Sequence, residues 1–177
     1  EQPGVGAEIP GYVRSRLGAW DHPQRSHKRF IDIHCQANEG CARMFLPANL
    51  GWWAVKTWSG AQGEPTFADD IEYLCAKALG TDSGLSLMGI DPANAATVPA
   101  LPRLAALLRR WESVRRGGGV PPAVKLRLRQ PGAEFRLEPA AGGQAAFRQV
   151  RHVRHQVASP EPWSSCWMVD NPWADQP

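Results

Sequence analysis

The sequence predicts an α/β fold that gives way to a β-rich region in its last third. In the first two thirds of the 177 residues, short apolar runs alternate with two segments whose apolar residues recur at helical spacing. After the three glycines at residues 117–119, short runs separated by turn residues take over. Strands that alternate with helices imply parallel pairing through crossover helices. We therefore expect two regions, residues 1–118 and residues 119–177.

Three apolar runs are the strand candidates of the first region: residues 30–35, 50–58 and 85–90. The first run has β-favouring bulk and also contains Asp32 and His34. Strand alternation places these two residues on one side of the run. Two polar groups on one face of an apolar strand are costly to bury unless they are paired or used. Asp32 and His34 are therefore candidates for a functional site.

Two segments of the first region have the spacing of helices. In residues 65–79, Thr66 can cap a helix, with Asp69 three residues later, and Gly80 follows as a stop. In residues 101–116, Leu104, Leu107, Leu108 and Trp111 form an apolar stripe. Residues 93–100, between the last strand candidate and the second helix, are expected to form a loop.

The second region is expected to form a small antiparallel sheet. Residues 124–129 (Val-Lys-Leu-Arg-Leu-Arg) alternate strictly, which is typical of a half-exposed strand. The pair Pro131-Gly132 is a turn signal. Further short strands are expected at residues 134–137, 146–152 and 163–169.

The composition permits a packed core and restricts the class of partner. Hydrophobic residues make up 43% and charged residues 21%, as in globular domains. The net charge is +3, and we read the arginines of the second half as solvated outer positions, so no nucleic-acid partner is expected. No apolar run reaches 18 residues, so no membrane-spanning helix is expected. The chain does not begin with Met, and we expect it to be a piece of a longer protein.

Cofactor and metal signatures are absent from the sequence. It has no Gly-rich phosphate loop, no HExxH and no GxSxG, which argues against nucleotide-binding, zinc-protease and α/β-hydrolase functions. The four Cys include no CxxC pair, and no Cys/His cluster has zinc-ligand spacing. Cys35 and Cys41 are close enough in sequence to form a disulfide, but nothing in the sequence requires one, and free buried thiols are the default expectation. No cofactor and no metal are expected, and the cellular location stays open.

The candidate site contains a pair of carboxylic acids. In parallel α/β folds, active groups gather where strands end, which selects Asp32 and Glu39 after the first strand candidate. Cleavage of a glycosidic bond needs two such groups, one as acid and one as base or nucleophile. The Trp side chains offer apolar walls on which sugar rings stack, although core packing explains most of the eight. The expected substrate-binding residues are Asp21, His22, His34, Trp53, Lys56, Trp58 and Asp91.

Four stretches resemble the later part of large bacterial glycoside-hydrolase-like proteins, in which a (β/α)8 barrel precedes β-sandwich domains. They are residues 20–23, 29–34, 45–53 and 69–79. The resemblance implies that residues 1–118 are the C-terminal part of a (β/α) barrel and that residues 119–177 begin a β-rich accessory region. It further implies a carbohydrate substrate, a secreted or periplasmic location, and the N-terminal part of the barrel as a missing partner. The middle strand that usually carries the general acid would be absent, so this piece alone is expected to be inactive.

Two functions of different classes follow. The first is a fragment of a carbohydrate-processing enzyme that hydrolyses glycosidic bonds with Asp32 and Glu39. The alternative is a non-catalytic carbohydrate-binding or structural module, in which Trp side chains bind or pack and the carboxylates cap helices. A basic nucleic-acid-binding piece is the third and remaining hypothesis.

Overall fold

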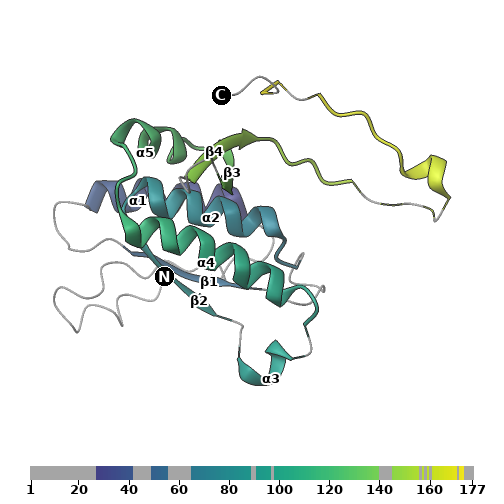
Figure 1. Cartoon of the computed structure of the whole chain (residues 1–177), viewed down its shortest axis with the longest axis horizontal. Helices are drawn as coiled ribbons and strands as arrows, with labels where there is room; N and C mark the ends of the chain where they lie inside the picture. The colour runs from purple at the N-terminus through teal and green to yellow at the C-terminus, as the bar shows by residue number, and fades with distance from the viewer. Residues whose placement is uncertain are drawn as a thin grey trace.

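A computed structural model describes residues 27–41, 49–55, 65–88, 91–96, 98–139, 145–155, 157, 159, 161–170 and 172–173 (Figure 1). Its elements, in chain order, are α1 (His27–Cys41), β1 (Asn49–Ala54), α2 (Ala68–Gly80), β2 (Gly84–Met88), α3 (Pro92–Ala95), α4 (Leu101–Gly117), α5 (Pro122–Leu128), β3 (Glu134–Pro139), β4 (Ala145–Val150) and the 3-10 helix Pro162–Ser165.

The structure has helices and two small sheets, as an α/β prediction requires. β1 pairs with β2 in parallel, with Trp53 opposite Leu87, and α2 is the crossover helix between them. β3 and β4 form the antiparallel pair expected in the second region, with Leu137 opposite Phe147. The strand predictions for residues 50–58, 85–90, 134–137 and 146–152 are therefore confirmed over residues 50–54, 85–88, 134–137 and 146–150. A barrel segment and a boundary at residue 118 stay predictions.

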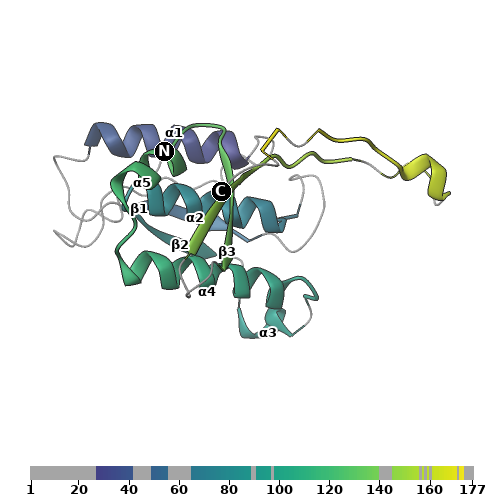
Figure 2. The same ribbon diagram turned by 45° about the horizontal axis from the view of Figure 1, so that its top comes forward.

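Helix α2 is the centre of the core. It lies between α1 and α4 in both views (Figures 1 and 2), and it also packs against α5 and β3. Every residue from 70 to 80 is buried, because α1, α4, α5 and β3 all pack against this helix. The apolar cluster on it draws on both sides of Gly118. Its largest members are Ile71, Leu79, Leu104, Trp111, Leu128, Phe135 and Leu137.

The prediction of a strand at residues 30–35 is wrong, because these residues belong to α1. Phe30, Ile31, His34 and Cys35 are buried, whereas Ile33 is 43% exposed. Positions i, i+1, i+4 and i+5 share one face of a helix, so the buried set follows a period of 3.6 residues rather than 2. An apolar run of six residues is too short for periodicity to distinguish a buried helix from a strand.

The prediction of a strand at residues 124–129 is also wrong, because α5 covers this segment. In a strand Leu126 and Leu128 would share a face, yet Leu126 is 50% exposed and Leu128 is fully buried. Pro122 stands at the first helical position, where its fixed φ favours a helix start and its missing N–H costs nothing. The turn predicted at Pro131-Gly132 is confirmed, with Gly132 at a φ of 74°.

Two further expectations differ from the structure. Residues 163–169 form no strand: the 3-10 helix Pro162–Ser165 is followed by extended chain that lies away from the helices (Figure 1). The expected loop at residues 93–100 contains the one-turn helix α3. In both segments the side chains are largely exposed, so no buried face fixes a regular period.

The start of α2 is set by a carboxylate inside the helix rather than by the Thr66 that the sequence favours. Asp70 accepts a hydrogen bond of 2.9 Å from the backbone N–H of Phe67, which is the N-cap residue. The helix ends at Gly80, where a Cβ atom would lie 2.8 Å from the backbone nitrogen of Arg129. Gly80 is thus required because α5 approaches this closely.

Lys77 is the one basic residue of α2, and it is fully buried. Its ammonium donates to the carbonyl oxygens of Leu128 (3.0 Å), Ala133 (3.1 Å) and Gln130. These carbonyls belong to the end of α5 and to the turn that leads into β3. The ammonium also lies 4.5 Å from the centre of the Tyr73 ring, a cation–π distance. Lys77 therefore joins α2 to the chain segment between α5 and β3.

Replacing Lys77 by Met should lower the free energy of unfolding by about 3 kcal/mol, because the buried carbonyls lose their shared donor. Urea denaturation followed by circular dichroism measures this change. The matched control is Lys125→Met on α5, whose ammonium pairs with the exposed Asp82 at 2.5 Å. The control should cost less than about 1 kcal/mol. Equal losses in the two variants would contradict the anchoring role of Lys77.

Candidate functional site

Asp32 and Glu39, the predicted catalytic pair, both lie on α1. The Tyr73 hydroxyl lies 2.7 Å from both carboxylate oxygens of Asp32 and donates to the carboxylate, and the Gly132 backbone N–H donates to it at 3.0 Å. Glu39 is exposed and forms a 3.7 Å ion pair with Arg129. Seven residues of helix separate the two by about 10 Å along the axis. Asp32 is thus held by structural partners, and the strand-end argument that selected both residues does not apply to a helix.

The predicted substrate-binding residues are dispersed. The His34 ring is buried, and its Nδ1 lies 2.7 Å from the Phe30 carbonyl oxygen on the preceding turn. Trp53 lies on β1. Asp91 is exposed just before α3. The other four, Asp21, His22, Lys56 and Trp58, lie outside the described residues.

Three further features that the sequence analysis considered are the cysteines, metal-binding groups and membrane-spanning helices. Cys35 is a free thiol whose pKa is raised to about 12, chiefly by burial. No group of three His, Cys, Asp or Glu residues that could hold a metal occurs among the described residues. None of the helices in the described ranges is long and apolar enough to cross a membrane.

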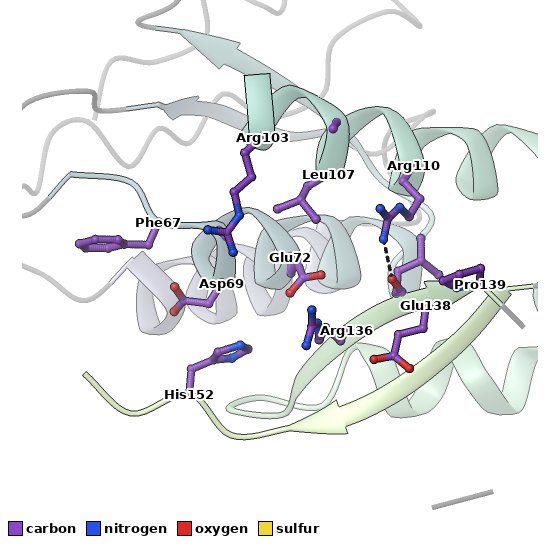
Figure 3. Close-up of a pocket in the computed structure, with 13 residues that line it drawn as sticks. Phe67, Asp69, Glu72, Arg103, Leu107, Arg110, Arg136, Glu138, Pro139 and His152 are labelled. Carbon is purple, nitrogen blue, oxygen red and sulfur yellow. Dashed lines mark hydrogen bonds between the residues drawn. The ribbon is translucent and has the colours of Figure 1, made fainter. Parts of the chain in front are cut away.

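An open cleft of about 840 Å³ lies between α2, α4 and β3 (Figure 3). The first turns of α2, the outer face of α4, the length of β3 and His152 form its walls. Its charged lining residues are Asp69, Glu72, Arg103, Arg110, Arg136 and Glu138. Among the described residues, none that the sequence predicted for the site lines the cleft.

Local structure explains how the arginines reach the cleft. Arg103, Leu107 and Arg110 recur at four and three residues on α4, which is one face of the helix. On β3 the side chains of Phe135 and Leu137 are buried, so alternation places Arg136 on the other side. The Arg110 guanidinium donates to the Leu137 carbonyl oxygen at 3.2 Å, which fixes α4 against β3.

Glu72 occupies the middle of the cleft, with the three arginines around it (Figure 3). Its side chain projects from α2, and the residue is only 5% exposed. Burial raises the pKa of its carboxyl group, while the charges of Arg136, His152 and Arg110 and a hydrogen bond from the Leu137 backbone oppose that rise. No ion pair to Glu72 occurs within the described residues.

The other two carboxylates of the lining already have cationic partners from outside it. Asp69 pairs with Lys28 at 2.7 Å and with Arg154 at 3.6 Å. Glu138 pairs with Arg148 at 3.7 Å. These two carboxylates therefore add little net negative charge to the cleft.

The three cleft arginines have no carboxylate partner within ion-pair distance in the described ranges. Three guanidinium groups without a carboxylate partner in the described ranges thus surround the buried carboxyl group of Glu72. Sequence reasoning missed this cleft because it read the arginines as solvated. The available signal was Arg103 and Arg110, seven residues apart on one helix face, together with a Glu inside the apolar helix at residues 65–79.

A network of ion pairs forms the end wall of the cleft. Lys28 bridges Asp69 and Glu134 at 2.7 and 2.8 Å. The other Glu134 oxygen accepts the backbone N–H of His152 at 2.8 Å and lies 2.7 Å from its ring Nδ1. Arg154 donates to Asp70 at 2.9 Å. These contacts fasten residues 152–154 to α2 and β3, which places His152 in the wall.

The network shifts the pKa values of its members. Burial alone would lower the pKa of Lys28, but its hydrogen bonds to Asp69 and Glu134 raise it overall. Burial alone would raise the pKa values of Asp69 and Glu134, but Lys28 lowers both, with help from His152 at Glu134. The folded state therefore favours the charged form of all three groups.

No known protein family, curated protein or solved structure matches this chain. The resemblance to bacterial glycoside-hydrolase-like proteins stays a prediction. The chemistry of the cleft is therefore the basis for a functional proposal.

The network should make stability fall in acid. Because Asp69 and Glu134 have lowered pKa values in the folded state, their contribution is present above their ordinary values of 3.8 and 4.5. It is lost as the pH falls through the folded values. Lys28→Met should lower the free energy of unfolding at pH 7 by about 2 kcal/mol and flatten its fall below pH 5. Urea denaturation at pH 7, 5 and 3.5 measures both effects, and Lys125→Met is the control. An unchanged acid slope in Lys28→Met would contradict the assignment.

Proposed function

We propose that the cleft between α2, α4 and β3 binds a small organic anion. The observation that carries this proposal is the group of three arginines, Arg103, Arg110 and Arg136, which surround Glu72 and have no carboxylate partner within the described ranges. Guanidinium groups offer paired N–H donors that match the oxygens of a carboxylate or a phosphate. The volume of about 840 Å³ lies within the range of small-molecule sites, which is about 300–1,000 Å³.

Exposed arginines usually interact only with water. The surroundings of these three arginines therefore decide whether they bind a ligand or are simply solvated. Here the guanidinium groups share a concave surface with Leu107, Ala106 and the buried Glu72. Charges attract more strongly beside apolar walls than in bulk water, because the effective dielectric constant is lower. Arg110 is also held in place by the Leu137 carbonyl. An anion that enters the cleft therefore meets donors that are partly arranged in advance.

Hydrolysis of glycosidic bonds is a second proposal, and one observation favours it. A glycosidase needs one carboxyl group that keeps its proton and a second that acts as base or nucleophile. Burial raises the pKa of Glu72, and Asp69 and Glu138 are further carboxyl groups of the same cleft. The acid would then be Glu72 rather than Asp32 or Glu39. The non-catalytic alternative, a carbohydrate-binding module, corresponds to binding in this cleft without turnover.

Removing a guanidinium group from the lining should weaken anion binding. Arg103→Gln and Arg136→Gln should each raise the dissociation constant for inorganic phosphate, used as the probe, by about tenfold, because each removes a charged donor. Isothermal titration calorimetry measures the constants. Arg109→Gln is the matched control, since this exposed arginine neighbours Arg110 on α4 but does not line the cleft. Equal weakening by Arg109→Gln would show a general charge effect and overturn the proposed site.

The second proposal predicts turnover that depends on Glu72. Release of nitrophenol from nitrophenyl glycosides should fall by about a hundredfold or more in Glu72→Gln, because the proton donor is lost. Asp32→Asn should instead lower the free energy of unfolding while turnover per folded molecule persists. Binding of sugars without release of nitrophenol by the unmodified chain would reject hydrolysis and support the non-catalytic alternative.

A further inference from the structure

Glu72 restricts which anions suit the cleft. Its carboxyl group lies among the three arginines (Figure 3) and is too buried for water to screen it fully. When it is ionised it repels a simple anion, and apart from the Leu137 backbone its oxygens have no donor once a ligand displaces water. A ligand that suits the whole cleft therefore has two parts: an anionic group for the arginines and a hydrogen-bond donor for Glu72.

The charge around Glu72 determines what kind of donor fits. Arg136, His152 and Arg110 act on Glu72 from three elements of the wall, in that order of strength. An ammonium group beside Glu72 would be repelled by the guanidinium groups of Arg136 and Arg110, whereas a hydroxyl group carries no charge and escapes the repulsion. A hydroxyl can also donate to the ionised carboxylate, or accept from the carboxyl group when it is protonated. The cleft therefore favours hydroxyl groups over amino groups.

Apolar surface completes the lining. Leu107, Ala106 and Ala68 lie between the charged residues, and the Phe67 ring at one end is 42% exposed. Arg154 lies over this ring at 4.7 Å, so the ring is already held in one orientation. Apolar side chains of this kind suit the C–H face of a sugar ring, which is flat and carries its hydroxyl groups at the edge.

From this geometry we infer that the cleft binds an anionic sugar, a polyhydroxylated ring that carries a phosphate or a carboxylate. The inference rests on the anion-binding function proposed above and specifies its ligand. The arginines hold the anionic group, Glu72 accepts a sugar hydroxyl, and Leu107 with Phe67 contacts the ring. Phosphate and carboxylate share the chemistry that the arginines recognise, so the experiment separates them.

The test compares probes on the full chain by isothermal titration calorimetry. Glucose 6-phosphate and glucuronate are the anionic sugars, and inorganic phosphate, acetate and glucose are the partial ligands. At least one anionic sugar should bind about tenfold more tightly than both of its parts, because one charged hydrogen bond is worth about that much. The tighter of the two anionic sugars identifies the preferred anionic group.

Replacing Glu72 should remove the preference for the sugar and raise the affinity for phosphate, a combination that misfolding would not produce. Glu72→Leu should abolish the tenfold preference for the sugar and at the same time tighten binding of inorganic phosphate, because acceptor and repulsion disappear together. Glu138→Gln is the matched control: it removes one charge from the same lining but should leave the preference ratio unchanged. Circular dichroism confirms that each variant is folded.

The outcomes separate the two proposals. If phosphate or acetate binds in a manner that depends on Arg103 but the anionic sugars bind no more tightly, the sugar inference is overturned and the anion proposal stands. If Glu72→Leu keeps the preference for the anionic sugar, Glu72 does not bind the sugar hydroxyl and the inference also fails. If no anion binds, both proposals fall together.

Discussion

The fold depends on a buried ammonium group that must find acceptors. Lys77 lies in the last turn of the buried helix α2, where an unpaired charge would cost several kcal/mol, and three backbone carbonyls from residues 128–133 accept its hydrogen bonds. The ring of Tyr73 lies beside the ammonium, and its hydroxyl donates to Asp32 on α1, whose carboxylate also accepts the Gly132 N–H. One polar centre thus joins α1, α2 and the end of α5. Since β3 begins directly after this segment, the same centre fixes where Arg136 enters the cleft.

The four charged residues of α2 have different partners and different roles. Asp70 caps its start and binds Arg154, Asp69 binds Lys28, and Lys77 anchors the segment before β3. Glu72 is the only acidic residue of this helix without an ion-pair partner or a side-chain donor within the described ranges, and its one hydrogen bond comes from the Leu137 backbone. A buried carboxyl group with so few partners is costly, which makes it a candidate for binding a ligand. This contrast makes the middle of the cleft, rather than the ion-pair network at its end, the centre of the candidate site.

The sequence predicts long elements well and short ones poorly, for a physical reason. Helices α2 and α4 extend over several turns, so their apolar stripes repeat often enough to exclude a strand. In α1 and α5 only one or two turns are apolar, and a single exposed residue, Ile33 or Leu126, decides the period. The candidate site was harder to predict from the sequence than the short helices. Its arginines come from α4 and β3, and only the packing that Lys77 and Arg110 enforce reveals that they surround a Glu of α2.

The same physical rule selects Asp32 when it is applied to the sequence and Glu72 when it is applied to the structure. A polar group in an apolar segment needs either a structural partner or a ligand, and this rule selected Asp32 from the sequence. The partners that satisfy Asp32 lie 41 and 100 residues further along the chain, where no local pattern can reveal them. The rule still applies in the folded chain. Asp32 has hydrogen-bond partners there, so the rule selects Glu72 instead. A candidate functional carboxylate is therefore recognised by its lack of charged side-chain partners in the folded chain, and burial alone is not sufficient.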